Sequence, residues 1–437
     1  MSAPLYSWGR YPDFPQTGHA CSWRSEVLAL RDSVIASHNT SLPYGNGRSY
    51  GDSCLSESDQ ILHMRSLDRF IEVDWERGTV RAEAGVTLSE ILAVSIPQGW
   101  FLSVTPGTQF VTLGGAIAND VHGKNHHLRG TFGNHVRSFG LLRHNQGLLT
   151  CSLTKNSELY AASIGGLGLT GVILWAEIQL IPIRSSQIDT TVVRFRNLAE
   201  FFLLSTELDH QHEYSVAWID CLAKGSEIGR GVFFVGDHAR YGSLDKNQRS
   251  KRSVPLTPPV SLINNLSLRT FNAAYWNAHP SERTLKRDNY EPFFYPLDRI
   301  LHWNRIYGRK GFQQYQCVIP DAVAEVVVRE LLLAISNSGQ GSFLAVLKRC
   351  GSIPSPGLLS FPLAGPSLAL DFPQKADLVS LFSRLDAIVR EAGGRLYPAK
   401  DAHMSGNDFR QAYPAWEQLE ALRDPSLMSR FWKRVTV

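Results

Sequence analysis

The chain has 437 residues, enough for two or three domains, and its hydrophobic fraction of 43% and charged fraction of 19% are those of a globular protein. A net charge of +4 is too small to indicate a nucleic-acid partner, and we expect none, although it weakly suits a substrate that carries phosphate. The six cysteines stand singly, without a zinc-ligand spacing, and the N-terminus lacks the pattern of a signal peptide, so we expect a cytoplasmic protein with reduced thiols.

Residues 34–183 alternate between short strand patterns and glycine-rich turns. Phe70–Asp74 and Thr79–Ala84 predict a hairpin. Thr87 and Glu90 have the spacing of a capping box, which predicts that a helix starts here, and Gly99 ends that segment.

An apolar run from Gly166 to Ile183 is nearly long enough to span a bilayer. Glu177 and Gln179 interrupt it, and its alternation from Val172 onward favours a buried strand. We therefore reject a transmembrane helix, while a peripheral contact with the inner face of the membrane stays open.

The middle of the chain has mixed patterns. Val216–Ile219 and Val232–Val235 predict strands, whereas residues 237–259 are polar, basic and end in two prolines, which predicts a long mobile loop. That loop is either a lid or polyphosphate contact, or, more simply, a solvated connection.

The last third of the chain carries a repeat of strand, helix and strand. Strands are predicted at 314–320, 343–348, 368–373 and 395–400; one helix is capped by Asp321 and closed by Gly339, and another spans Asp377–Ala392. Two such units in succession predict an α+β, ferredoxin-like sheet with helices on one face.

This repeat brings polar side chains together. Because side chains alternate along a strand, Gln314 and Gln316 point to the same side, and Lys348 and Lys400 lie at matching ends of the two units. The face without helices can thus present amides and ammonium groups to a ligand. The alternative is that these are ordinary polar residues at a sheet edge.

Three glycine-rich segments, 44–52, 105–127 and 164–172, indicate a bound nucleotide. Glycine lets backbone N–H groups approach a pyrophosphate, and consecutive N–H groups form an anion nest. The nearest approach to a dinucleotide fingerprint, at 166–171, leads into a strand and is weak evidence alone. Glycines that serve only tight turns are a common explanation for one such segment and a poorer one for three.

Other catalytic classes find no support. His122 and His126 are four residues apart, but Gly123 breaks any helix between them, so we expect no metal. A serine hydrolase finds no support either, because nothing in the sequence places Asp and His residues together.

Taken in order, these segments resemble the vanillyl-alcohol oxidase type of FAD-binding proteins. The resemblance rests on Gly45–Asp52, Pro106–Thr108, Gly114–Ala118 and Gly165–Gly171. Within that family, His122–His127, Gly133–Val136, Tyr315-Gln316, Asp371–Pro373 and Tyr397–Asp401 are similar to the decaprenylphosphoryl-β-D-ribose 2′-oxidase branch. Ala369-Leu370 and Phe294-Tyr295 differ from the Cys-Val and Tyr-His of the mycobacterial oxidases, and fall in the implied substrate pocket.

The resemblance implies a PCMH-type FAD-binding domain over 1–184, a ferredoxin-like substrate or cap domain over 185–392, and a segment, 393–437, that returns to the first domain. It implies that FAD is bound by Gly45, Asn46, Gly47, Arg48, Ser49, Gly51, Pro106, Gly107, Thr108, Gly114, Gly115, Ala118, Asn119, His122, Gly123, Asn125, Gly168, Gly171, Val172 and Ile173. Arg48 stands where several relatives attach the flavin through a histidine, so we expect non-covalent FAD.

The implied reaction is oxidation of a sugar hydroxyl, most simply the 2′-OH of a polyprenyl-phosphate-linked pentose. Lys400 is the candidate base, or alternatively a cationic anchor, and Gln316 is expected to position the hydroxyl. Substrate contacts are expected from Gln314, Lys124, Lys348 and Tyr50. The partner is then a separate NAD(P)H-dependent short-chain reductase that completes a 2′-epimerisation. The alternatives are a soluble aldonolactone or alditol oxidase that uses O2, and a flavin-binding protein without catalysis.

Overall fold

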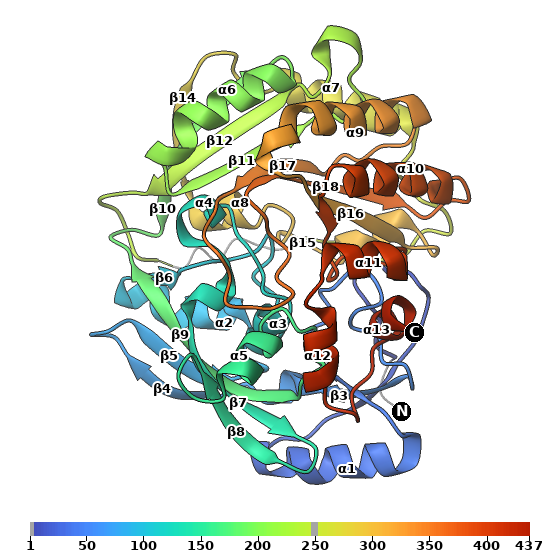
Figure 1. Cartoon of the computed structure of the whole chain (residues 1–437). Helices are drawn as coiled ribbons and strands as arrows, with labels where there is room; N and C mark the ends of the chain where they lie inside the picture. The colour runs from blue at the N-terminus through green and yellow to red at the C-terminus, as the bar shows by residue number, and fades with distance from the viewer. Residues whose placement is uncertain (1–3, 246–251) are drawn as a thin grey trace.

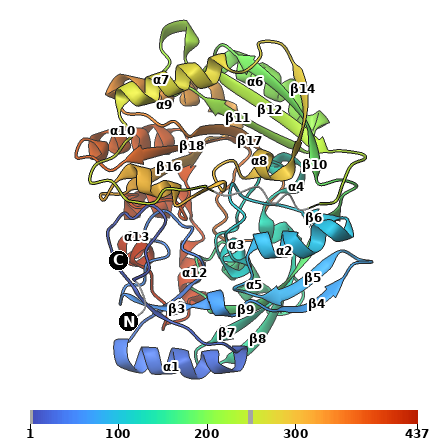
Figure 2. The same cartoon turned by 180° about the vertical axis from the view of Figure 1, so that it is seen from behind.

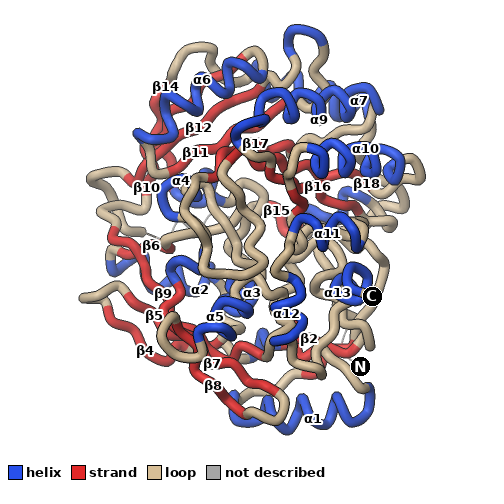
Figure 3. Tube along the Cα trace, in the orientation of Figure 1, coloured by secondary structure: helices blue, strands red, loops and turns tan. Residues whose placement is uncertain are grey.

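The computed structural model describes residues 4–245 and 252–437, and its strands form two large sheets with helices packed around them (Figure 1). The N-terminal part of the chain and the last helices build one half of the molecule, and the middle of the chain builds the other (Figure 1). Long loops fill much of the space between the two halves (Figure 3). Loops held by rigid sheets are the usual carriers of binding residues.

The N-terminal half contains a three-stranded parallel sheet and a six-stranded sheet. The first has the order β1 (Thr17–His19), β3 (Gln60–His63), β2 (Leu42–Tyr44). The second has the order β4 (Phe70–Asp74), β5 (Thr79–Glu83), β9 (Val172–Pro182), β7 (Val136–Arg143), β8 (Gly147–Ser152), with β6 (Trp100–Leu102) paired to β9. The helices of this half are α1 (Val27–His38), α2 (Leu88–Ser95), α3 (Leu113–Ala118), α4 (His126–Arg129) and α5 (Ser157–Ser163).

Three predictions in this half are confirmed. β4 and β5 form the predicted antiparallel hairpin. Thr87 caps α2: its side chain accepts the N–H of Glu90, and the Glu90 carboxylate accepts the N–H of Thr87 at 2.8 Å. From Val172 to Pro182 the apolar run forms strand β9, and none of the helices in the described ranges is both long and apolar enough to cross a bilayer.

The other half is an eight-stranded antiparallel sheet built from two units that each have the strand and helix order of a ferredoxin-like fold, although one helix of the first unit lies on the opposite face. The first unit consists of β10 (Gln187–Phe195), α6 (Leu198–Leu208), β11 (Tyr214–Ile219), β12 (Gly231–His238), α7 (Asn265–Asn277) and β14 (Thr284–Asn289). The second consists of β16 (Phe312–Val318), α9 (Ala324–Ser338), β17 (Ala345–Cys350), β18 (Gly365–Pro373), α10 (Leu378–Glu391) and β19 (Arg395–Leu396). The sheet order is β14-β10-β12-β11-β17-β18-β16-β19, so each unit runs fourth, first, third, second strand, and the two second strands, β11 and β17, join them.

The repeat predicted in the last third is therefore correct, and so is the α+β class. The sequence did not predict the first unit, because a long polar connection separates α7 from β12. Helix α7 also lies on the face of the sheet opposite to α6 (Figure 2). Adjacent residues of β12 show the two faces: Phe233 contacts Phe201 of α6, with ring centroids 5.8 Å apart, whereas Phe234 contacts His279, just beyond α7, at 5.7 Å.

Three local predictions need correction. Asp321 does not cap α9; it lies in a preceding 3-10 turn, Asp321–Val323, and accepts a hydrogen bond from Arg349. The last strand ends at Leu396, and Lys400 lies in a turn in which its own backbone N–H donates to the Tyr397 carbonyl. The predicted loop 237–259 is shorter at both ends, because Asp237 and His238 belong to β12 and Arg252–Ser253 form β13; its residues 246–251 lie outside the described residues.

The remaining elements join the two halves. β13 (Arg252–Ser253) pairs with β15 (Ile300–Leu301), and α8 (Tyr290–Phe294) follows β14. After β19 the chain returns through α11 (Gly406–Ala412), α12 (Trp416–Leu422) and α13 (Arg430–Thr436). There Arg434 forms ion pairs with Asp52 and Asp401, at 2.9 and 2.8 Å, which fix the turn that carries Lys400. The domain boundaries at 184/185 and 392/393 stay a prediction.

Candidate active site

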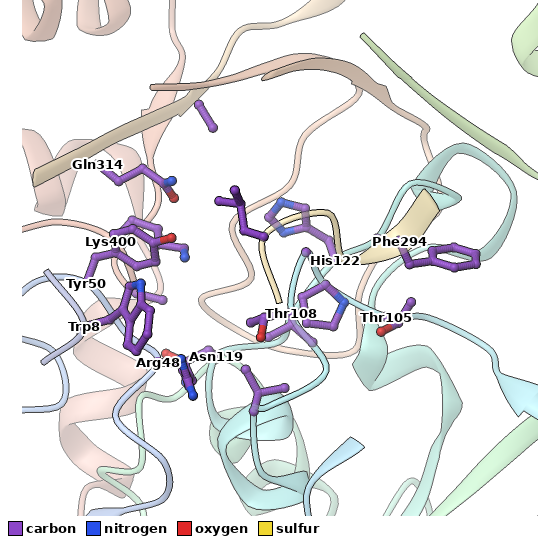
Figure 4. A pocket seen from close by; sticks show the side chains of 18 of the residues that line it. Trp8, Arg48, Tyr50, Thr105, Thr108, Asn119, His122, Phe294, Gln314 and Lys400 are labelled. Atoms are coloured by element: carbon purple, nitrogen blue, oxygen red, sulfur yellow. The ribbon is translucent and has the colours of Figure 1, made fainter. Parts of the chain in front are cut away.

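A cavity of about 700 Å³ lies between the two halves. Its walls are the glycine-rich loops on one side and one face of the eight-stranded sheet on the other. Seen from close by, Tyr50 and Lys400 lie side by side, with Trp8 and Arg48 below them and Gln314 above, and His122 lies apart from these residues (Figure 4).

Most of the predicted cofactor residues line this cavity. They are Gly45, Asn46, Gly47, Arg48, Ser49, Pro106, Gly107, Thr108, Gly114, Gly115, Ala118, Asn119, His122, Gly123, Gly168, Gly171 and Ile173. Three segments far apart in the sequence are thus brought to one wall, as the sequence predicted for a nucleotide site.

The backbone of these loops requires glycine. Gly47 and Gly168 have positive φ angles of 57° and 76°, which residues other than glycine rarely adopt. A Cβ added at Gly107 would have no heavy atom within 4 Å, so the backbone here borders open space. Such bare backbone, with its N–H groups accessible, suits the pyrophosphate of FAD.

Arg48 supplies a cation to the same wall. Its guanidinium lies 4.1 Å from the ring centroid of Trp8 and 5.3 Å from that of Phe110. Its Nε is buried and, within the described residues, has no hydrogen-bond partner. This donor is available to an anionic ligand. Trp8 was missed, because nothing in the sequence connects it to a loop 40 residues away.

Three predicted cofactor residues do not line the cavity. A Cβ at Gly51 would lie 1.6 Å from the Asp401 carbonyl oxygen, so this glycine permits close packing of two backbones. Asn125 is buried and donates to the carbonyl of Ser103 at 2.8 Å, and Val172 is fully buried in a hydrophobic cluster with Val27 and Leu62. The structure gives all three a role in holding the loops.

Lys400 and Asp371 form the centre of the polar group on the sheet side. Lys400 Nζ lies 3.5 Å from the centroid of the Tyr50 ring. Burial lowers the pKa of Lys400 to about 7, against the opposing effect of Asp371. Burial likewise raises the pKa of Asp371, although Gln314 donates to its Oδ1 at 2.6 Å and Lys400 lies nearby. A lysine with a pKa near neutrality can act as a base.

Gln316 and His122 connect the sheet to the glycine loops. Gln316 Nε2 lies 3.1 Å from His122 Nε2 and 3.5 Å from Ser367 Oγ. Because an amide NH2 donates, His122 Nε2 accepts and its proton resides on Nδ1. Burial, together with Lys348, lowers the pKa of His122 well below its usual value. The buried Nδ1 has no hydrogen-bond partner among the described residues, so a neutral imidazole offers a donor to a ligand.

Lys124 and Lys348 add two further ammonium groups. Lys124 Nζ donates to the Phe294 carbonyl at 3.2 Å, and Lys348 Nζ donates to the Gly123 carbonyl at 2.8 Å. Burial lowers the pKa of Lys124 to about 7 and that of Lys348 to about 8, and Lys348 itself lowers the pKa of Lys124. In the part of the chain that the structure describes, none of the three lysines forms an ion pair with a carboxylate. Such a concentration of cations is stabilised by an anionic ligand.

The structure thus brings Gln314, Gln316, Lys348, Lys400, Lys124 and Tyr50 to one cavity. Asp371 was missed as a site residue because its partner, Gln314, is identified only by the register of β16 against β18. The two histidines that raised the question of a metal have separate partners: His122 contacts the Gln316 amide, and His126 accepts a hydrogen bond from the Gly351 N–H. No group of three potential metal ligands occurs in the described ranges.

Comparison with known proteins identifies the family. Residues 27–152 match the FAD binding domain family. Decaprenylphosphoryl-β-D-ribose oxidase of Mycolicibacterium smegmatis is 35% identical over 438 residues, which cover 96% of this chain and 94% of the relative. The chain belongs to the family of that oxidase. It is an FAD-dependent oxidoreductase, and FAD is its cofactor.

Two other relatives help to delimit the similarity. An uncharacterised Streptomyces coelicolor protein is 32% identical over 78% of this chain and 96% of its own length. L-gulonolactone oxidase of Bos taurus is 33% identical over only 32% of this chain and 31% of its own. The glycine loops and Arg48 fit FAD, and Lys124, Lys348, Lys400, Gln314 and Gln316 line the same cavity.

Proposed function

We propose that the enzyme oxidises a secondary hydroxyl of a sugar to a ketone, and that its substrate is a polyprenyl-phosphate-linked pentose oxidised at the 2′-OH. The observation that carries the proposal is the group of three half-buried lysines, Lys124, Lys348 and Lys400, that line one cavity with Gln314 and Gln316 of β16. Amides suit hydroxyl groups, and ammonium groups suit a phosphate. A relative that covers nearly the whole chain is named for a substrate of this kind.

Each polar residue has a task in this reaction. FAD supplies the acceptor for the hydride that leaves the carbinol carbon. Neutral Lys400 takes the hydroxyl proton, and Gln316, held by His122, orients the hydroxyl. Asp371 keeps the pKa of Lys400 from falling further, while Lys124 and Lys348 bind the phosphate. Alcohol C–H and O–H bonds break, a C=O bond forms, and one proton stays on Lys400.

The cellular setting follows from this substrate. A 2′-ketone is half of an epimerisation, so a separate NAD(P)H-dependent short-chain reductase is expected to consume it. A lipid-linked substrate places the enzyme in the cytoplasm at the inner face of the membrane, through a peripheral contact.

The first test uses the flavin as its own indicator. Lys400→Ala is expected to retain FAD but to lose anaerobic flavin reduction by the prenyl-phospho-pentose. Unchanged reduction would contradict the role of Lys400.

An aldonolactone or alditol oxidase that uses O2 is the second candidate, because L-gulonolactone oxidase matches part of the chain. A neutral lactone carries no phosphate, so it would give the three lysines no anion to bind. Anaerobic flavin reduction by each substrate class distinguishes the two functions.

A further inference from the structure

One face of the eight-stranded sheet changes from polar to apolar along its width. The register gives one row of neighbouring side chains across four strands: Gln316, Ala369, Val346 and Trp218. A second row begins with Ser367 and Lys348. If the register of β11 against β17 is continued by one residue beyond Ala217 and Leu347, this row goes on to Val216, Phe234 and Val192. In both rows the polar residues belong to the second ferredoxin-like unit, and the first unit contributes only apolar ones; Thr190, Lys286 and Asp288 of the first unit line the cavity in the rows beyond these.

The apolar part of this face is open to the same cavity as the lysines. Val192, Val216, Trp218, Phe234 and Val346 all line the cavity. Three spacings between neighbouring strands separate Trp218 from Gln316, a distance of about 14 Å. An apolar groove, defined by these five residues, therefore begins beside the candidate reaction site and leads away from it.

Helix α7 forms the opposite wall of the groove with Phe271 and Tyr275. The Tyr275 ring lies 4.6 Å from that of Trp218, and Phe271 lies 5.8 Å from Phe343. The helix is held at its other residues: buried Asn272 donates to Asp220 at 2.8 Å, and Trp276 donates to the Phe195 carbonyl at 3.1 Å. These polar anchors keep α7 in place while its aromatic side chains border the groove.

We propose that this groove binds the hydrocarbon tail of the substrate, next to the phosphate. The inference rests on the proposed function, since it assigns the phosphate of one amphiphilic substrate to the second unit of the sheet and the hydrocarbon tail mainly to the first. Ala217 pairs with Leu347, so the register continued by one residue sets Val216 opposite Lys348, and a phosphate on Lys348 places the first carbons of its ester chain on Val216. A cation at one end and apolar side chains beyond it complement an anionic head with an apolar tail. A water-soluble sugar phosphate leaves the apolar half without a partner.

The test measures binding rather than turnover. Alkyl phosphates of four, eight and twelve carbons, below their micelle concentrations, are titrated into the FAD-loaded enzyme and followed by the change in the flavin spectrum. Burial of each methylene strengthens binding by a factor of about three to four at most. We expect affinity to rise steeply with chain length. Equal affinity for all three lengths would overturn the inference.

Two variants locate the effect, each with a matched control. Val216→Trp fills the groove beside Lys348, and Phe271→Glu places a carboxylate on its outer wall; Phe271 is 42% exposed, so this variant is expected to fold. Both are expected to weaken binding of the twelve-carbon phosphate at least tenfold and to leave the four-carbon phosphate nearly unchanged. Val326→Trp and Leu203→Glu make the same changes at positions 73% and 71% exposed on α9 and α6, and are expected to bind like the wild type. If Phe271→Glu keeps the full dependence on chain length, the groove is not the tail site. Length-dependent binding without oxidation of a prenyl-phospho-pentose would instead contradict only the proposed function.

Discussion

Replacement of Asp371 by Asn tests how the site controls its base. The Asn oxygen can still accept the hydrogen bond from Gln314, so the change removes mainly the negative charge. That charge raises the pKa of Lys400 against the effect of burial. An opposite charge at close range typically changes a pKa by about one to three, and we take a change of about one as the smallest effect to expect here. Without it, the pKa of Lys400 falls from about 7 toward about 6.

The sign of the expected change follows from the protonation state that the reaction needs. Neutral Lys400 is the base, so the rate of anaerobic flavin reduction rises with pH through the pKa and is level above it. Burial raises the pKa of Asp371 itself to about 7, so its charge acts on Lys400 mainly at pH 7 and above. At pH 7 about half of the wild-type lysines and up to about nine-tenths of those in the variant are neutral, which predicts reduction up to about twofold faster in Asp371→Asn, with a smaller difference at pH 6 and equal rates at pH 9. Stopped-flow flavin absorbance measures both. Asp386→Asn changes a carboxylate that contacts Tyr315 and His403 and is the control. If the pH profile of flavin reduction in Asp371→Asn is unchanged or shifted to higher pH, Lys400 is not the base.

Three further predictions concern the phosphate lysines and the cofactor. Lys124→Met should raise the melting temperature most at pH 7 and below, and should raise KM for the phospho-sugar. Burial lowers the pKa of Lys124 to about 7, so wild-type stability rises with pH from about 7 to the unfolded pKa near 10. The gain in stability of the variant is at most about 5 kcal/mol, on the order of 1 kcal/mol after solvent screening, and should shrink over that pH range. An equal gain at pH 7 and pH 10 would speak against a buried ammonium group. Gly107→Leu should fold with an unchanged melting temperature of the apoprotein but retain less FAD, because the added side chain enters open space at the cavity wall; full flavin content would exclude this loop from the cofactor site. Acid denaturation followed by filtration should release all the flavin, since Arg48 stands in the first loop; flavin that stays with the protein would show a covalent bond.

The sequence predicted the local features best. The capping box at Thr87, the hairpin after Phe70 and the repeat after Phe312 depend on neighbours in the chain, and the structure contains all three. The glycine segments likewise line one cavity, because their chemistry is a property of the backbone at each residue.

What the sequence missed depends on pairing between distant residues. Asp371 contacts Gln314 only through the register of two strands, and Trp8 reaches Arg48 across the fold. The strand expected at 395–400 ends early because the chain turns at Pro398 to bring Lys400 to Tyr50, a contact that no local pattern encodes. The duplication of the ferredoxin-like unit was hidden by α7, which lies on the face where the groove is formed.

The most direct test of the central claim is anaerobic reduction of the enzyme-bound flavin by a prenyl-phospho-pentose that carries deuterium at C2′. We predict that the unlabelled substrate bleaches the flavin, that deuterium slows the bleaching, and that the product is the 2′-ketone. Bleaching by an aldonolactone or alditol, with none by the prenyl-phospho-pentose, would contradict the proposed function.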